Sequence, residues 1–131
     1  MLQRIVVGYD YSEPSDDALG WAMDLARSLG SRVLLAYVLD ARSDDDPALN
    51  EAREKLARVA DELGPEAQSH VIVGKDVADS LVRFCEESNA DAIVLSTAGF
   101  GGVARFLLGS VADAVVRSAR CPVITLRHER V

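Results

Sequence analysis

Residues 4–39, "RIVVGYDYSEPSDDALGWAMDLARSLGSRVLLAYVL", place a strand, a helix and a second strand in immediate succession. The two ends, "RIVVGY" and "RVLLAYVL", are continuous apolar runs rich in β-branched residues, a pattern typical of strands covered on both faces. Between them Ser12 is a plausible helix N-cap, Pro14 suits the first turn, and Gly30 can end the helix in a left-handed conformation. Buried strands joined by a helical crossover predict a parallel sheet.

The same alternation continues toward the C-terminus. Further strands are expected at "SHVIVG", "DAIVLST" and "CPVITLR", and further helices near Pro47, Asp76 and Ser110. The third strand is more polar at its start than the others, which favours a place at a sheet edge. The pattern therefore predicts a doubly wound α/β fold, with five parallel strands and helices on both faces. Because no linker or internal repeat interrupts the pattern, we expect a single domain over residues 1–131.

Composition limits the classes of function. With 49% hydrophobic and 27% charged residues, the chain is expected to be soluble and globular, and no apolar run approaches the ~18 residues of a membrane span. Its start lacks a signal-peptide core, so a cytoplasmic location is expected. A net charge of −7 argues against nucleic acid as a partner. Cys85 and Cys121 lack metal-site or redox spacing and are expected to be small buried hydrophobes.

The glycine-rich stretch from Ser96 to Ser110, "STAGFGGVARFLLGS", is the main candidate for a functional site. It is longer than the ~4–6 residues of most connections, and it follows the fourth strand at the carboxyl end of the sheet, where ligands bind in open α/β folds. Asp10 follows the first strand at the same end. The glycines and the free amides of the helix beginning at Ser110 suit a phosphate. A capping pair between Ser110 and Asp113 is the alternative that needs no ligand.

This loop, with the following "VADAVVRSARCPVITLR" and the opening "RIVVGYDYSEPSDDAL", resembles the universal stress protein family over essentially the whole chain. The family's loop pattern is Gly-x2-Gly-x9-Gly-Ser/Thr. Gly99, Gly109 and Ser110 match it, whereas Ser96 stands at the first glycine and Ala98 where a basic or polar residue is frequent. The resemblance implies a Rossmann-like fold with strand order 3-2-1-4-5.

The resemblance also implies a site for ATP or AMP, with Mg or Mn carried on the phosphates rather than by a cluster of protein ligands. Asp10 would accept a hydrogen bond from a sugar hydroxyl, unless it only stabilises its turn. Val38 would meet the adenine through its backbone, and the amides around Gly109 and Ser110 would meet the phosphates. The full set implied for the nucleotide is Gly8, Tyr9, Asp10, Val38, Leu95, Ser96, Thr97, Gly99, Gly109, Ser110 and Val111.

Catalysis is not expected. His70 and His128 are predicted to lie at the surface away from the loop, and no nucleophile–base pair is visible near Ser110. A nucleotide-binding regulatory protein with at most slow ATP hydrolysis is therefore favoured, and the resemblance implies a role in stress responses. The alternative, favoured by Ser96 and Ala98, is a dimeric interaction module of the same fold that binds no nucleotide.

A homodimer is expected in either case. In the implied strand order the fifth strand is a sheet edge, and its run Val123–Leu126 is apolar and rich in β-branched residues. An exposed edge of this kind invites pairing with another chain, and two copies can pair antiparallel about a two-fold axis, as members of the family resembled here do. The alternative is that the tail "HERV" shields the edge.

Overall fold

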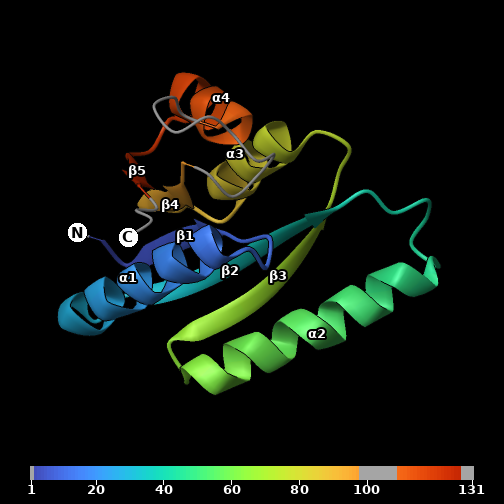
Figure 1. The fold of residues 1–131 in the computed structure, drawn as a ribbon, viewed down its shortest axis with the longest axis horizontal. Helices are drawn as coiled ribbons and strands as arrows, with labels where there is room; N and C mark the ends of the chain where they lie inside the picture. The colour runs from blue at the N-terminus through green and yellow to red at the C-terminus, as the bar shows by residue number, and fades with distance from the viewer. Residues whose placement is uncertain (1, 98–108, 128–131) are drawn as a thin grey trace.

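The computed structural model describes residues 2–97 and 109–127 (Figure 1). Within them a five-stranded parallel sheet has the order β3-β2-β1-β4-β5, which confirms both the predicted fold class and the implied strand order. Strands and helices alternate along the chain as β1 (Arg4–Gly8), α1 (Glu13–Leu29), β2 (Arg32–Leu39), α2 (Pro47–Leu63), β3 (Ala67–Val73), α3 (Val77–Glu87), β4 (Ala92–Ser96), α4 (Ser110–Ser118) and β5 (Val123–Leu126).

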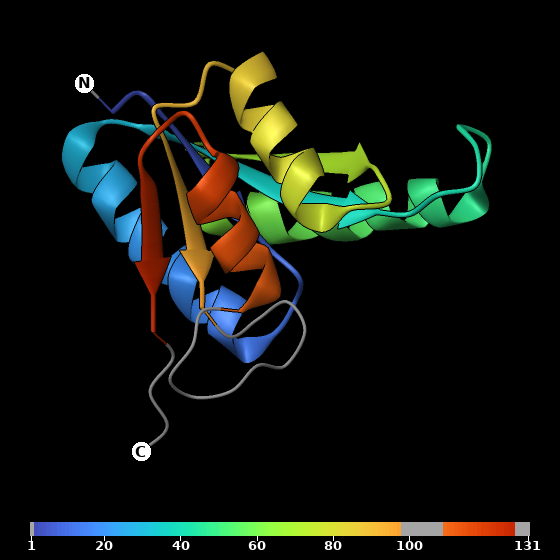
Figure 2. The same ribbon diagram turned by 90° about the horizontal axis from the view of Figure 1, so that it is seen from above.

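Helices cover both faces of the sheet (Figures 1 and 2). On the face of α1 and α2, one apolar cluster joins Val7 and Leu35 of the strands to Met23 and Leu56 of the helices. The cluster on the face of α3 and α4 is built from alternate strand positions together with helix residues, among them Val6, Ile93, Leu81 and Val115. Because β1 and β4 bury side chains on both faces, their sequences are apolar from Ile5 to Val7 and from Ala92 to Leu95.

The predicted helix starts follow from local hydrogen bonds. Ser12 caps α1 by accepting from the Ser15 backbone N–H at 3.2 Å, and Asp76 caps α3 by accepting from the Asp79 N–H at 2.9 Å. Asp46 caps α2 in the same way, with Pro47 at the first helical position. At the other end of α1, Gly30 has a φ of 69°, in the left-handed region that favours glycine. Each of these ends was readable from the sequence.

The strands do not all end at the same level, and this positions the candidate site. Gly8, the last residue of β1, pairs with Ala36, and β2 continues beside β3 to Leu39. β4 pairs with β1 on one side and with β5 on the other. The end of β1 is therefore recessed relative to that of its longer neighbour β2.

The two edges of the sheet are β3 and β5. The edge position predicted for the third strand is confirmed, although the strand begins at Ala67, earlier than the expected "SHVIVG", because its polar residues pair along β2. In the described parts of the chain, none of the helices has the length and apolar character needed to cross a lipid bilayer.

Candidate functional site

The turn between β1 and α1 holds Asp10 in a defined position. Its backbone N–H donates to Ser15 Oγ at 3.3 Å, and its Oδ1 accepts from the Ser12 N–H at 3.0 Å. Ser15 is fully buried, so this turn is anchored to the core. The turn-stabilising role considered for Asp10 is thus observed. It occupies only one carboxylate oxygen, since Oδ2 has no hydrogen bond to any other described residue.

Tyr9 contributes backbone rather than side chain to this end of the sheet. Its ring is 4% exposed, and its hydroxyl donates to Asp16 of α1. Burial, followed by the nearby Asp16 carboxylate, raises the pKa of Tyr9 above its ordinary value. The Tyr9 side chain is therefore part of the core beneath α1. The resemblance implied a nucleotide-lining residue here, and only the backbone of Tyr9 remains for that role.

Tyr11 shows a feature that the sequence reasoning missed. Its φ is 67°, a left-handed conformation that costs energy for a residue with a Cβ. Its ring packs edge-on between Tyr9 and Tyr37, with centroid distances of 4.8 and 5.4 Å, and Lys55 Nζ lies 4.0 Å from its centroid. These contacts offset the strain and fix the direction in which the chain leaves β1.

Val38 presents its backbone toward the recess beyond β1. The Tyr9 N–H donates to the Ala36 carbonyl at 2.9 Å, so the backbone groups of Ala36 point toward β1. In a strand, residues two apart point the same way, and Val38 therefore faces the same side. Because β1 has ended, the Val38 N–H and carbonyl have no strand partner among the described residues. The next carbonyl, that of Leu39, points to β3 and accepts from the Gly74 N–H at 3.0 Å.

The β4–α4 connection closes on itself next to this recess. The Thr97 N–H donates to the Leu126 carbonyl at 2.9 Å, and the Gly109 N–H donates to the Thr97 carbonyl at 2.7 Å. Leu95 and Ser96 are buried, so neither presents its side chain at the surface of this end of the sheet. Gly99, also in the implied site, lies outside the described residues.

The N-terminus of α4 differs from those of the other helices. Gly109 is its N-cap, and the first helical hydrogen bond runs from the Asp113 N–H to the Gly109 carbonyl at 2.8 Å. No side chain caps this helix among the described residues, and Ser110 is exposed. No described residue accepts from the amides of Ser110 and Val111, which lie in the partial positive charge of the helix end.

The predicted capping pair between Ser110 and Asp113 is not observed. Ser110 is the first residue of the helix rather than its cap, and Asp113 accepts instead from Arg117 Nε at 3.0 Å. The capping-pair reading was therefore wrong. Among the described helices, α1, α2 and α3 each have a side chain that caps the first amides, whereas α4 has none.

The fold brings most of the predicted residues to one end of the sheet. Since β1 and β4 are paired neighbours, the Asp10 turn and the Thr97–Gly109 contact both lie at the carboxyl ends of these two strands. The described members of the implied set that meet here are Gly8, Tyr9, Asp10, Val38, Leu95, Ser96, Thr97, Gly109, Ser110 and Val111.

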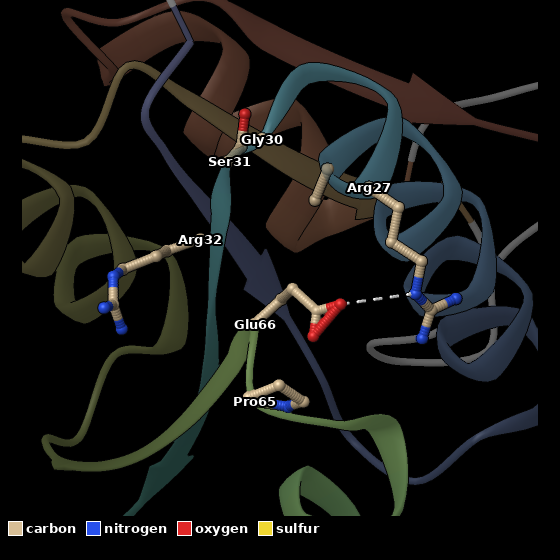
Figure 3. Close-up of a pocket in the computed structure, with 7 residues that line it drawn as sticks. Arg27, Gly30, Ser31, Arg32, Pro65 and Glu66 are labelled. Atoms are coloured by element: carbon tan, nitrogen blue, oxygen red, sulfur yellow. Dashed lines mark ion pairs between the residues drawn. The ribbon is translucent and has the colours of Figure 1, made fainter.

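A hollow lies at the opposite end of the sheet from the candidate site, where α1 and α2 end (Figure 3). Its volume is about 340 Å³, and Arg27 and Glu66 form its charged wall, with Arg27 Nε 3.7 Å from Glu66 Oε1. Arg27 also donates to the Leu63 carbonyl at 2.9 Å, which ties α1 to the end of α2. Arg27 and Glu66 are thus used in contacts between elements, Arg32 also lines the hollow, and the sequence did not indicate a site here.

Groups suited to catalysis do not gather in the described part of the chain. No three His, Cys, Asp or Glu side chains there form a cluster that could hold a metal ion. Burial, followed by the neighbouring Cys121, raises the pKa of Cys85 to about 12, so its thiol is a poor nucleophile. Cys85 is buried as expected, and Cys121 is partly buried beside it.

The surface position expected for His70 was wrong. The residue lies in β3, is half-buried, and its ring centroid is 5.0 Å from that of Phe84 in α3. Burial lowers the pKa of His70 below its ordinary value. An edge strand lacks a strand partner on one side, but a helix can still cover its face. Here Phe84 of α3 covers the face of β3 that carries His70. His128 lies outside the described residues.

The lowered pKa of His70 predicts that the fold loses stability in mild acid. The folded state binds fewer protons than the unfolded chain, so the contribution is complete above about pH 6.5 and is lost as the pH falls below that value. Urea unfolding of the wild type and of His70→Phe, compared between neutral pH and about pH 5.5, measures it. The wild type should lose more free energy of unfolding than the variant. An equal loss in both would contradict the prediction.

The comparisons with known proteins agree with this geometry. Residues 1–127 match the model of the universal stress protein family. A universal stress protein of Methanocaldococcus jannaschii is 30% identical over 145 residues, covering 99% of this chain and 85% of its own length. The solved structure of the universal stress protein from Archaeoglobus fulgidus in complex with dAMP is 33% identical. Its TM-score is 0.73, and the match covers 95% of this chain and 98% of that one.

A second solved structure extends the likeness in fold. The universal stress protein UspA from Lactobacillus plantarum has a TM-score of 0.79 at 22% identity, and the match covers 96% of this chain and 98% of that one. The family model matches nearly the whole chain, and the matched residues include the strands of the sheet and the N-terminus of α4. The chain belongs to the universal stress protein family.

Proposed function

We propose that the protein binds an adenine nucleotide, ATP or AMP, in the recess beyond β1 and β4, and that it acts as a regulatory protein in stress responses. The observation that carries the proposal is the N-terminus of α4. Its first amides have no side-chain cap among the described residues, and the Gly109–Thr97 hydrogen bond holds them beside the end of β1. The dAMP complex of the related Archaeoglobus fulgidus protein supports a nucleotide as the ligand.

Three sets of protein groups contact different parts of the nucleotide in this proposal. The Val38 carbonyl and N–H match the donor and acceptor on the edge of an adenine ring. Asp10 Oδ2 is the acceptor for a ribose hydroxyl, because Oδ1 is already used by Ser12. The amides of Ser110 and Val111 meet the phosphates, with Mg²⁺ or Mn²⁺ carried on the phosphate oxygens. Because the chain as a whole carries a net charge of −7, the negative charge of the phosphates must be offset by groups close to them.

The proposal is tested by asking whether the protein binds nucleotide at all. Purified protein is denatured, and the released small molecules are separated by chromatography and detected by their absorbance. Protein freed of ligand is then titrated with ATP and AMP by calorimetry. Binding of either supports the proposal. The absence of both carried and titrated nucleotide would overturn it in favour of the interaction module that binds no nucleotide.

The role of Asp10 predicts equal effects on two nucleotides. Asp10→Asn keeps an oxygen to accept from the Ser12 N–H but removes the second acceptor. Since ATP and AMP share the ribose, both should bind more weakly by about 1.5–3 kcal/mol, the cost of a hydrogen bond to a charged group. Calorimetric titration of both ligands measures this. A loss confined to ATP would show that Asp10 acts at the phosphates instead.

We further propose that the protein is a homodimer that pairs through β5. Among the described residues β5 has a strand partner on one side alone, β4, and all four of its residues are half-buried. The Thr97 N–H reaches the Leu126 carbonyl and the Ile93 N–H reaches that of Pro122, so even-numbered residues of β5 point to β4. The backbone groups of Val123 and Thr125 therefore point to the open edge, where a second copy can pair with them.

A further inference from the structure

Three apolar residues form a stripe along α1 that the fold leaves largely uncovered. Trp21, Leu25 and Leu29 follow one another at intervals of four, so they share one flank of the helix. Trp21 is 42% exposed and Leu29 is 52% exposed, and both are among the large apolar side chains exposed in the described residues. Leu25, between them, is partly buried against the core.

The stripe faces the β5 side of the molecule. Arg27, which bonds to Leu63 and pairs with Glu66, marks the flank of α1 that faces α2 and β3. Residues two apart in a helix lie about 200° apart around its axis, so Leu25 and Leu29 lie on the flank opposite Arg27. Leu25 packs on the same buried cluster as Ile124 and Leu126 of β5. The stripe and the side chains of Ile124 and Leu126 therefore lie on the same face of the sheet.

Pairing through β5 alone would make a small interface. The strand has four residues, a length of about 13 Å, whereas stable dimers bury about 1,200–2,000 Å² in total. A dimer through this edge needs further apolar surface next to the strand, and the stripe on α1 offers it on the face of the sheet to which Ile124 and Leu126 contribute.

We infer that the Trp21–Leu25–Leu29 stripe is the second part of the dimer interface, and that it is covered by a second copy of this chain. The inference rests on the β5 dimer proposed above. Antiparallel pairing places the two-fold axis perpendicular to the sheet, so both α1 helices lie on the same face and flank the paired β5 strands.

Strand spacing sets the width of the gap between the two helices. α1 lies over β1 and β4, so about four strand spacings, or about 19 Å, separate the two α1 axes. Helices in direct contact are about 8–10 Å apart, which leaves a gap floored by Ile124 and Leu126 of both copies. The two stripes border this gap, and their large side chains fill it.

Trp21 reports on its own environment because it is the only tryptophan in the chain. Its emission and its quenching by acrylamide are followed during dilution, while light scattering gives the mass in parallel. The inference predicts that emission shifts to longer wavelength and quenching increases as the dimer dissociates. A dimer whose dissociation leaves both signals unchanged would overturn the inference and leave the β5 dimer standing. A chain that is monomeric throughout would overturn both proposals, whereas nucleotide binding is measured separately.

Substitutions on the stripe give a second readout. Leu29→Glu keeps Trp21 as the probe and should raise the dimer dissociation constant at least about tenfold, as expected for a core position of an interface. Val73→Glu is the matched control, since Val73 is 48% exposed but lies on β3, the opposite edge of the sheet. Both side chains are exposed, so neither change should unfold the monomer. Equal dissociation constants for the two variants would count against the inference.

Discussion

Gly109→Val is expected to abolish ATP binding while leaving the domain folded. Gly109 is a buried residue at the start of α4, with φ −59° and ψ 156°, a conformation that a residue with a Cβ can adopt. A branched side chain needs room beside the helix amides, where the phosphates are proposed to approach. Losing one to two hydrogen bonds to a charged group should weaken binding at least about 100-fold, or about 2.8 kcal/mol.

The control for this variant is Gly20→Val. Gly20 lies on α1, and a Cβ built there meets no other atom within 4 Å, so valine is accommodated far from α4. Calorimetry compares the affinities of wild type and both variants, and circular dichroism compares their folds. Affinity that stays unchanged in a folded Gly109→Val protein would mean that the β4–α4 connection is structural rather than a phosphate site.

The second large effect is expected at β5, where Ile124→Lys should convert the dimer to monomer. A lysine here places a charge in a half-buried apolar strand, next to the proposed two-fold axis, and burying an unpaired charge is costly. Light scattering after size exclusion should give a mass near one chain for the variant and near two for the wild type. Val73→Lys on the opposite edge is the control and should remain dimeric.

Thr125→Pro tests the same interface without a charge. Because the backbone of Thr125 points away from β4, proline removes an N–H from the open edge and none from the β4 ladder. The variant should therefore keep its fold, checked by thermal unfolding, and lose dimerisation. A wild-type mass near one chain at micromolar concentration, or a dimer that survives both changes, would refute pairing through this strand.

Local features of the fold could be read from the sequence because their causes are local. Ser12 and Asp76 cap their helices through backbone amides three residues away, and Gly30 takes the left-handed position that its lack of a Cβ permits. The apolar runs of β1 and β4 likewise report burial on both faces. Strand order is different, because it depends on which strands meet in space. It came from the family resemblance and not from periodicity.

The misread features depend on contacts between distant elements. His70 was expected at the surface, but its burial comes from Phe84, a residue of a different helix. The left-handed conformation of Tyr11 is held by edge-on packing against Tyr37 and by Lys55, residues distant in the sequence that no local pattern indicates. The capping role considered for Ser110 was wrong for a local reason: Gly109 is the N-cap of α4, and Ser110 is already its first helical residue. Most residues of the implied nucleotide site lie at one end of the sheet because they stand at or just after the carboxyl ends of its strands.

The central position of β1 has a consequence for synthesis on the ribosome. β1 is translated before both of its partners; β2 follows soon after, but β4 begins only at Ala92. Until then β1, a central strand of the finished sheet, is an open edge, and β4 is needed before α1 can pack on both β1 and β4. The Asp91 carboxylate, which accepts from the Gln3 and Arg4 amides at 2.8 and 3.0 Å, joins the beginning of β1 to the beginning of the later strand β4. The first two-thirds of the chain must therefore emerge while a β-rich apolar edge stays unpaired, the stage at which this topology is most exposed to aggregation and to capture by chaperones.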